Sequence, residues 1–215
     1  MMSFKTMLGA CALSLATLAG SAQAATVVNG SFERHPRVGN WAVFDTIPGW
    51  RTVDGNGIEI QTNRTLGQID AQHGRSYVEL DSHPNDGNSN STMRQSIAFD
   101  VGRYLLSFYY SPRTHDAGSN GIAYSIGTDL MNLLSGSITG PGRDTAVGQW
   151  TRVTGLFDVT KAGTYNLDFA ATGRAETYGG LIDNVAISPV PVPAGGVLLL
   201  TALGGLALAR RRQRA

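Results

Sequence analysis

Apolar and polar residues alternate in short runs through the middle of the chain. The segments with this pattern are 58–61, 76–80, 96–99, 104–110, 121–126, 151–157, 164–170 and 181–187. A period of two predicts β-strands with one buried face, and turn-forming sequences rich in Gly, Asn and Asp separate the segments. Only the short segment 130–134 has helical spacing. Eight or nine strands at this spacing predict an all-β fold, an antiparallel β-sandwich.

The first 24 residues have a different pattern. Lys5 precedes an apolar stretch at 7–20, and Ser21-Ala22-Gln23-Ala24 supplies the small residues that a signal peptidase requires. We therefore predict a secretory signal peptide at 1–24, cleaved after Ala24. A membrane anchor is the alternative, but the stretch is shorter than the ~20 residues of a typical span. Lipoprotein-type cleavage before Cys11 would leave almost no apolar segment upstream.

The last part of the chain also departs from the alternation. Val190-Pro191-Val192-Pro193-Ala194 leads into an uncharged apolar run at 195–209, and Arg210, Arg211, Arg212 and Arg214 follow. As a helix, this run is about 22 Å long, and the preceding residues could complete a crossing of a ~30 Å bilayer core. The arginines predict a transmembrane helix with its C-terminus in the cytoplasm and the rest of the chain outside. A buried core helix is the alternative, but the terminal basic cluster argues against it.

Between these ends lies one predicted domain, residues 25–188, which is long enough for a single core. The chain has a formal net charge of +1, and several positive charges belong to the tail, so the domain is slightly acidic. Nucleic acid is therefore not an expected partner. The sole cysteine, Cys11, lies in the predicted signal, and the sequence has no Cys/His motif typical of zinc sites. Without disulfides, an exported sandwich often depends on calcium.

The tail resembles a known class of sorting signal. Its order of Val-Pro-x-Pro-Ala, apolar helix and Arg cluster is similar to the PEP-CTERM signals in their VPxPA variant, although Val192 replaces the usual Leu. This resemblance implies that an exosortase-type enzyme cuts near Pro191, Pro193 and Ala194. The Arg cluster at Arg210, Arg211 and Arg212 would stay cytoplasmic until then. The protein would be transiently anchored in the inner membrane and then delivered to the cell surface or extracellular matrix of a Gram-negative, polysaccharide-producing host.

The central domain resembles another family. The sequences concerned are Val28-Asn29-Gly30-Ser31-Phe32-Glu33, Ile47-Pro48-Gly49-Trp50, Tyr77-Val78-Glu79-Leu80-Asp81 and Leu181-Ile182-Asp183-Asn184-Val185. They are similar to galactose-binding-like jelly-roll domains, which include many carbohydrate-binding modules. The resemblance implies a structural Ca²⁺ held by Glu33, Asp183 and main-chain oxygens near Ser31. Alternatively, these carboxylates cap turns or pair with a base such as Arg34.

A carbohydrate site requires exposed aromatic rings beside polar side chains. The candidates are Trp41, Trp50, Tyr109, Tyr110, Tyr178, Arg113, Asn120, Glu59, Glu79 and Gln95. From these we predict Arg113, Trp50, Glu79, Tyr110 and Asn120 as ligand-binding residues, with Arg113 foremost because it follows the most apolar strand. The alternative is that most aromatic residues belong to the core, as the sequence around Trp50 and Trp150 suggests. Tyr109 and Tyr110 should lie on opposite faces of their strand. The four histidines are expected at the surface.

Three functions are compatible with these features. The first is a non-catalytic, surface-displayed protein that binds extracellular polysaccharide or cell-wall glycan. The second is a structural component of a biofilm or sheath, without a sugar site. The third is a glycan hydrolase, for which Glu79 and Asp81 share one face of a strand as a carboxylate pair. We favour the first, because of the family resemblance and the sorting tail. The absence of a second domain and of a recognisable catalytic motif argues against the third.

Overall fold

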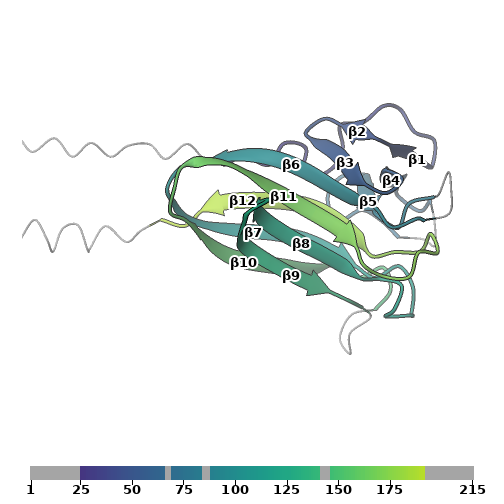
Figure 1. The fold of residues 1–215 in the computed structure, drawn as a ribbon. Coiled ribbons are helices and arrows are strands. Elements are labelled where there is room, and N and C mark those ends of the chain that lie inside the picture. Colours follow the sequence, from purple (N-terminus) through teal and green to yellow (C-terminus); the bar gives the residue numbers. More distant parts are fainter. Residues whose placement is uncertain (1–24, 66–68, 84–87, 141–145, 192–215) are drawn as a thin grey trace, which may run out of the picture.

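The computed structural model describes residues 25–65, 69–83, 88–140 and 146–191, which form two antiparallel six-stranded sheets packed face to face (Figure 1). The predicted signal peptide at 1–24 lies outside these residues, as does nearly all of the predicted sorting tail at 189–215. Within the described part of the chain, no helix has the length and apolar character needed to span a membrane. The β-sandwich predicted for the central domain is confirmed.

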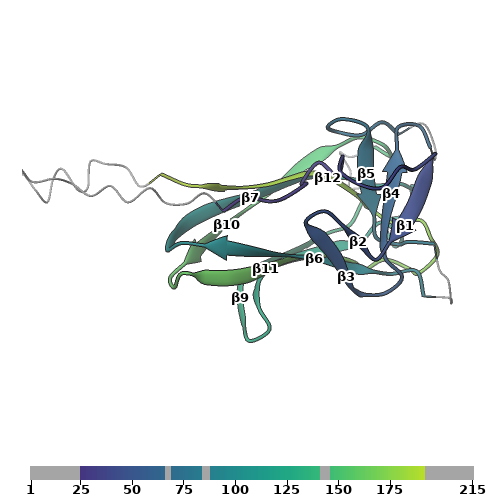
Figure 2. The same ribbon diagram turned by 90° about the horizontal axis from the view of Figure 1, so that it is seen from above.

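Each sheet combines strands from distant parts of the chain. In sheet A the order is β1 (Trp41–Phe44), β4 (Ile58–Thr62), β5 (Ser76–Glu79), β12 (Leu181–Pro189), β7 (Gly102–Ser111) and β10 (Thr151–Val159). In sheet B the order is β2 (Thr46–Ile47), β3 (Trp50–Asp54), β6 (Thr92–Phe99), β11 (Gly163–Ala171), β8 (Ile122–Thr128) and β9 (Met131–Ile138). Figure 2 shows the two layers from above.

All eight segments predicted from alternation are strands, namely β4 to β8 and β10 to β12. The structure adds four strands that the alternation did not predict, β1, β2, β3 and β9. The helical spacing at 130–134 is misleading, because Met131–Ile138 forms β9. The turn at 128–131 folds this segment back on β8, with Met131 opposite Thr128. Pairing with β8 therefore overrides the local spacing of the leucines.

Aromatic side chains fill the space between the sheets. Trp50 lies 5.7 Å from Phe32 and 6.0 Å from Phe169 between ring centroids, and Phe169 lies 4.9 Å from Phe108. Trp50 is 2% exposed, and its indole N–H donates to the main-chain oxygen of Asn29 at 3.3 Å. Such rings bury large apolar areas in tilted and edge-to-face pairs, so this cluster joins the N-terminal segment to both sheets.

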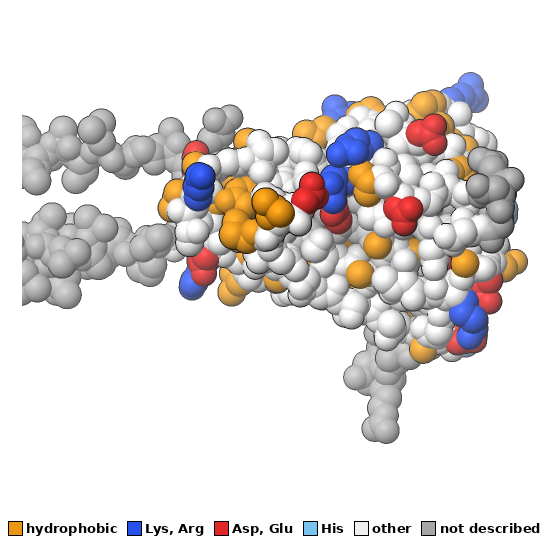
Figure 3. All heavy atoms as spheres, viewed as in Figure 1, with side chains coloured by type: hydrophobic (Ala, Val, Ile, Leu, Met, Phe, Trp, Pro, Cys, Tyr) orange, Lys and Arg blue, Asp and Glu red, His pale blue; other side chains and the backbone are white. Residues whose placement is uncertain are grey.

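The described ends of the chain lie together at one end of the sandwich. The N-terminal segment runs beside β12, where the N–H of Val185 donates to the oxygen of Gly30 at 2.8 Å. After β12, the N–H of Val190 donates to the oxygen of Arg103 at the start of β7, again at 2.8 Å. The loops that follow β5, β7 and β11 lie at the opposite end (Figures 1 and 2). On the face seen in Figure 3, the described acidic and basic side chains are scattered among uncharged ones.

Candidate functional site

The pairing of β4 with β5 sets four polar side chains side by side. Glu59 lies opposite Glu79, and Gln61 lies opposite Tyr77. These residues alternate with Ile58, Ile60 and Val78 of the core, so they point to the outer face of sheet A. All four are nevertheless buried, at 1% exposure or less. Carboxylates are rarely buried without partners, so the contacts of Glu59 and Glu79 determine what this cluster can do.

One network of hydrogen bonds joins the two carboxylates. The Gln61 amide donates to Glu59 Oε1 at 2.8 Å and also to Glu79 Oε2. The Arg113 guanidinium forms an ion pair with Glu79, and its Nη1 also donates to the oxygen of Thr177 at 3.0 Å. The N–H of Gly179 donates to Glu79 Oε1 at 2.6 Å. The sequence-predicted residues Glu79 and Arg113 are therefore direct partners.

The Glu79 carboxyl has a strongly altered acidity. Burial raises its pKa from 4.5 to about 8, the nearby Arg113 charge lowers it, and the Glu59 charge raises it further. Removing a carboxylate from water disfavours its charged form, and one guanidinium only partly offsets this. Glu79 therefore exchanges its proton near neutral to mildly alkaline pH.

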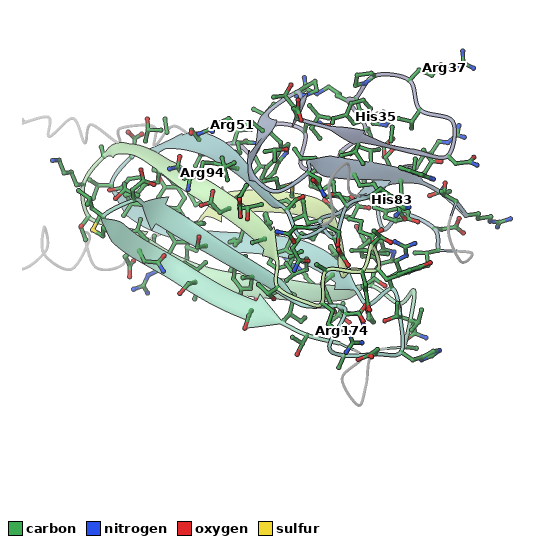
Figure 4. The ribbon with its side chains drawn as sticks, turned by 45° about the vertical axis from the view of Figure 1, so that its right-hand side comes forward. His35, Arg37, Arg51, His83, Arg94 and Arg174 are labelled. Atoms are coloured by element: carbon green, nitrogen blue, oxygen red, sulfur yellow. The ribbon has the colours of Figure 1, made fainter. Side chains whose placement is uncertain are left out.

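Two exposed aromatic rings lie at the ends of this network. The N–H of His83 donates to Glu59 Oε2 at 3.0 Å, and the Trp41 ring stacks on the His83 ring with 4.2 Å between centroids. At the other end, the Arg113 guanidinium lies 4.7 Å from the centre of the Tyr178 ring. Trp41 is 38% exposed and Tyr178 is 50% exposed. Figure 4 shows His83 at the loop-bearing end of the sandwich.

A small apolar cluster covers the neighbouring part of the same face. Ile69, Tyr77 and Leu181 are buried there, and the partly buried Trp150 packs against them. The Trp150 ring meets Tyr77 edge to face at 5.9 Å, and its indole N–H donates to the oxygen of Asp70 at 2.8 Å. The described part of the segment between β4 and β5 thus packs on the outer face of sheet A, where Ile69 and Asp70 contact this cluster.

Two buried polar atoms of the cluster have no hydrogen-bond partner in the described structure, Gln61 Oε1 and Tyr77 Oη. Buried polar atoms are almost always paired with protein or with ordered water. Because Gln61 and Tyr77 are opposite each other on neighbouring strands, one bridging group could satisfy both.

A hollow of about 810 Å³ lies beside Trp41. Its lining includes Val43 and Asp45 from the region of β1, together with Asn56 and His83. Trp41 and Val43 supply apolar surface, whereas Asp45 and Asn56 supply polar groups, and sites for small molecules and sugars commonly combine the two.

The structure places three other sequence-predicted ligand residues inside the fold. Trp50 and Tyr110 belong to the core between the sheets, at 2% and 1% exposure. The Tyr110 hydroxyl donates to the oxygen of Asn120. Asn120 is completely buried, where its Oδ1 accepts from the N–H of Arg113 and its Nδ2 donates to the oxygen of Gly140. These three side chains present no surface to a ligand, and Asn120 instead shapes the loop that carries Arg113.

The suggested carboxylate pair of Glu79 and Asp81 is also completely buried. Asp81 Oδ2 accepts from the N–H groups of Glu176 and Tyr178, and Glu79 is held by Arg113 and Gly179. A carboxyl group that acts on a glycosidic bond must contact that bond. In this conformation neither group can reach a substrate.

Sequence reasoning did not single out Gln61, Tyr77 or His83 as site residues. The alternation in 58–61 and 76–80 did place Glu59, Gln61, Tyr77 and Glu79 at positions facing away from the core. What it could not supply was the register between the two strands. His83 was expected at the surface; its side chain is indeed 42% exposed, but it also contacts buried Glu59.

The residues predicted to hold calcium lie around the segment that precedes β5. Glu33 Oε1 accepts from the N–H groups of Arg75 and Ser76, both at 2.8 Å. Asp183 Oδ2 accepts from the N–H of His73 at 2.8 Å. Burial raises the pKa of Asp183 to about 7, and the charge of Glu33 adds to this effect. Neither carboxylate has an ion-pair partner within the described residues.

These carboxylates fit a hard cation by chemistry, because they are oxygen donors that repel each other without a nearby positive side chain. Main-chain N–H groups already engage both, which is also what turn-capping carboxylates do. In the described parts of the chain, no group of three or more His, Cys, Asp or Glu side chains is arranged to hold a metal ion. Most other ligands would therefore be main-chain oxygens or water, as in the predicted site near Ser31.

No protein-family model and no curated protein sequence matches this chain. Solved structures do match it. An arabinose-bound GH51 α-L-arabinofuranosidase is 12% identical over 80% of this chain, with a TM-score of 0.51, and this chain spans only 27% of that enzyme. A CBM61 module in complex with β-1,4-galactotriose is 17% identical over 66% of this chain and 88% of its own, with a TM-score of 0.48. The CBM35 module from Paenibacillus barcinonensis is 19% identical, with a TM-score of 0.40, over 71% of this chain and all of its own.

The chain shares a β-sandwich fold with part of the arabinofuranosidase. At 12% identity this likeness concerns the fold alone. Function has to be argued from the side chains of this chain.

Proposed function

We propose that this domain binds a carbohydrate chain, without cleaving it, at the end of sheet A between Trp41 and Tyr178. One observation carries the proposal. The two exposed rings lie at opposite ends of a continuous series of contacts, from Trp41 through His83, Glu59, Gln61, Glu79 and Arg113 to Tyr178.

This arrangement suits a sugar for physical reasons. A sugar ring presents an apolar C–H face that packs on an aromatic ring, and hydroxyl groups that need directional partners. Trp41 and Tyr178 supply the rings, and His83 and Asn56 supply polar groups beside Trp41. The Arg113 side chain is only 7% exposed and supports the Tyr178 ring from beneath. Because Glu59 and Glu79 hold His83 and Arg113 in place, little conformational freedom remains to be lost on binding.

Glu59 and Glu79 therefore act as positioning residues in this proposal. Of the residues predicted from sequence, Arg113 stays in the proposal as the mostly buried residue that positions Tyr178, whereas Trp50, Tyr110 and Asn120 are left out. The ligand class is an extracellular polysaccharide or cell-wall glycan. The burial of Glu79 and Asp81 supports binding over hydrolysis.

Affinity electrophoresis against a panel of extracellular polysaccharides and cell-wall glycans tests the proposal. We expect at least one polymer to retard the protein, and Trp41→Ala and Tyr178→Ala each to weaken that retardation about tenfold or more. The matched control is Leu156→Ala, which truncates another exposed apolar side chain, on β10. If both aromatic variants bind as the native protein does, the site is elsewhere. If no polymer binds, a structural role in a biofilm or sheath is favoured.

We further propose that the domain is a galactose-binding-like jelly roll that the cell exports and sorts. The signal at 1–24 and the Pro-Val, apolar and Arg segments of the tail support this view. Intact-mass analysis of the protein from its host is expected to show a chain that begins at Ala25 and ends near Ala194. A mass that includes residues 195–215 in the surface fraction would rule out exosortase-type cleavage.

We also propose a structural Ca²⁺ between Glu33 and Asp183, near Ser31. The ion would supply positive charge where two carboxylates meet and would fix the N-terminal segment against β12. EGTA is expected to lower the melting temperature by several degrees, and added Ca²⁺ should restore it. An unchanged melting temperature in EGTA would remove this part of the proposal.

A further inference from the structure

Asp81 and Asn90 form an isolated antiparallel bridge beyond the end of β5. On either side of them, the N–H of Ser91 donates to the oxygen of Leu80 at 2.7 Å, and the N–H of Ser82 donates to the oxygen of Ser89 at 2.8 Å. This pattern defines a non-hydrogen-bonded antiparallel pair, in which the Cα atoms are about 4.5 Å apart and the side chains are close. Asp81 and Asn90 therefore project side by side from the same face.

Both side chains reach the loop between β11 and β12. Asp81 Oδ2 accepts from the N–H of Tyr178 at 2.8 Å, and Asn90 Nδ2 donates to the oxygen of Gly173 at 2.8 Å. The remaining oxygens, Asp81 Oδ1 and Asn90 Oδ1, are buried and have no hydrogen-bond partner in the described structure. Two unpartnered acceptors thus lie next to each other beneath this loop.

Rearranging the side chains does not provide hydrogen-bond partners for both oxygens. Rotating the Asn90 amide by 180° would place Asn90 Oδ1 against the oxygen of Gly173, which now accepts from Asn90 Nδ2. Asp81 is completely buried, and no arginine, lysine or histidine of the described residues pairs with it. Arg174, at the same end of the molecule (Figure 4), pairs with Asp116 and Glu176. A buried carboxylate without a positive partner is unfavourable.

We propose that Asp81 Oδ1 and Asn90 Oδ1 bind a cation of the Ca²⁺ class. Carboxylate and amide oxygens are ligands that Ca²⁺ prefers, and main-chain oxygens and water complete its coordination in proteins. The site is separate from the pair Glu33 and Asp183. Ile182 pairs with Val78, so Asp183 lies about four residues, or about 13 Å, from Asp81 along the strand direction.

The cation would stabilise the loop that carries one side of the proposed glycan site. Asp81 Oδ2 holds the N–H of Tyr178, and the oxygen of the preceding residue, Thr177, accepts from Arg113. A cation that offsets the charge of Asp81 would therefore stabilise the positions of Tyr178 and of Thr177, which binds Arg113. This consequence rests on the proposed glycan binding, whereas the cation site itself does not.

Counting bound Ca²⁺ in the purified protein by equilibrium dialysis and elemental analysis tests the proposal without any glycan. We expect Asp81→Asn to bind one Ca²⁺ per chain fewer than the native protein, because it removes the charge and keeps the shape. Asn90→Ala should give the same loss and serves as the second variant if Asp81→Asn does not fold, as judged by near-ultraviolet circular dichroism.

Two control variants separate this site from others. Asp158→Asn, which changes an exposed carboxylate at the other end of the molecule, should bind as many Ca²⁺ as the native protein. Glu33→Gln should keep the ion bound by Asp81. Equal counts in the native protein, Asp81→Asn and Asn90→Ala would overturn the proposal and assign the two acceptors to buried water or to a protonated Asp81. Loss of one Ca²⁺ with unchanged glycan binding would instead contradict only the link to Tyr178.

Discussion

At the scale of single residues, the buried pair of Glu79 and Arg113 controls how the site responds to pH. Burial raises the pKa of Glu79 to about 8 in the folded protein, whereas the unfolded chain has the ordinary value of 4.5. The folded state therefore binds more protons than the unfolded state between these values. Stability must fall as pH rises through this window, by up to about 1.4 kcal/mol per pH unit.

Glu79→Gln is expected to remove this part of the pH dependence, because the amide resembles the protonated carboxyl at every pH. Urea denaturation of the native protein and of Glu79→Gln between pH 5 and pH 9 measures how the free energy of unfolding depends on pH. Asp183, whose pKa is raised to about 7, contributes in the same direction in both proteins, so the difference between their curves isolates Glu79. Parallel curves for the two proteins would show that Glu79 is already ionised when folded.

The two tryptophans Trp50 and Trp41 are expected to differ sharply in their contribution to stability. Trp50 is enclosed by Phe32 and Phe169, so Trp50→Ala should lower the free energy of unfolding by about 3–5 kcal/mol. Trp41 makes one stacked contact at the surface, so Trp41→Ala should cost only about 1 kcal/mol. Chemical denaturation of both variants at one pH compares them. A larger loss for Trp41→Ala would mean that the core assignment of Trp50 is mistaken.

At the scale of elements, the N-terminal segment packs against β12 at a distance that admits only glycine. A Cβ on Gly30 would lie 1.9 Å from the oxygen of Val185, whose N–H donates to Gly30. Gly30→Ala must therefore move backbone against backbone, and we expect it to destabilise the protein by about 2 kcal/mol or more. At Gly39 no atom lies within 4 Å of the position that a methyl group would take, so Gly39→Ala is the matched control and should be nearly neutral. Equal melting temperatures for the two variants would contradict this packing.

The strands differ in how far their sequences reveal them. β4 to β8 and β10 to β12 were predictable because alternation and turn residues mark them. β2 has only two residues, β1 lies at a sheet edge, and the leucines of β9 have helical spacing, so local pattern could not identify these three. The candidate site shows the same limit. Glu79 and Arg113 were named from sequence, but their connection through Gln61 to Glu59 and His83 depends on strand register and loop packing.

At the scale of the whole molecule, the aromatic rings and the described chain ends lie at opposite ends of the sandwich. The sequence contains two lysines, Lys5 in the predicted signal and Lys161 in the turn between β10 and β11. Lys161 is exposed and lies at the end where the chain leaves the domain. Coupling the protein to a sensor surface through amines is therefore expected to leave glycan binding intact.

Coupling through a cysteine introduced at Ala117 should block that binding, because Ala117 lies in the exposed loop that follows Arg113. Surface plasmon resonance with the same glycan compares the two orientations. Binding that survives at Ala117 and disappears at Lys161 would place the site at the other end of the sandwich.

β7 begins where the chain leaves the domain and ends at Ser111, two residues before Arg113. Its ten residues span about 33 Å at about 3.3 Å each. Electrostatic screening in physiological salt has a length of about 8 Å, so the field of an anionic lipid surface decays fully over that distance. In the transiently membrane-anchored form that the tail predicts, we therefore expect glycan affinity to be independent of the charge of the lipids, and a bound polymer to lie clear of their headgroups.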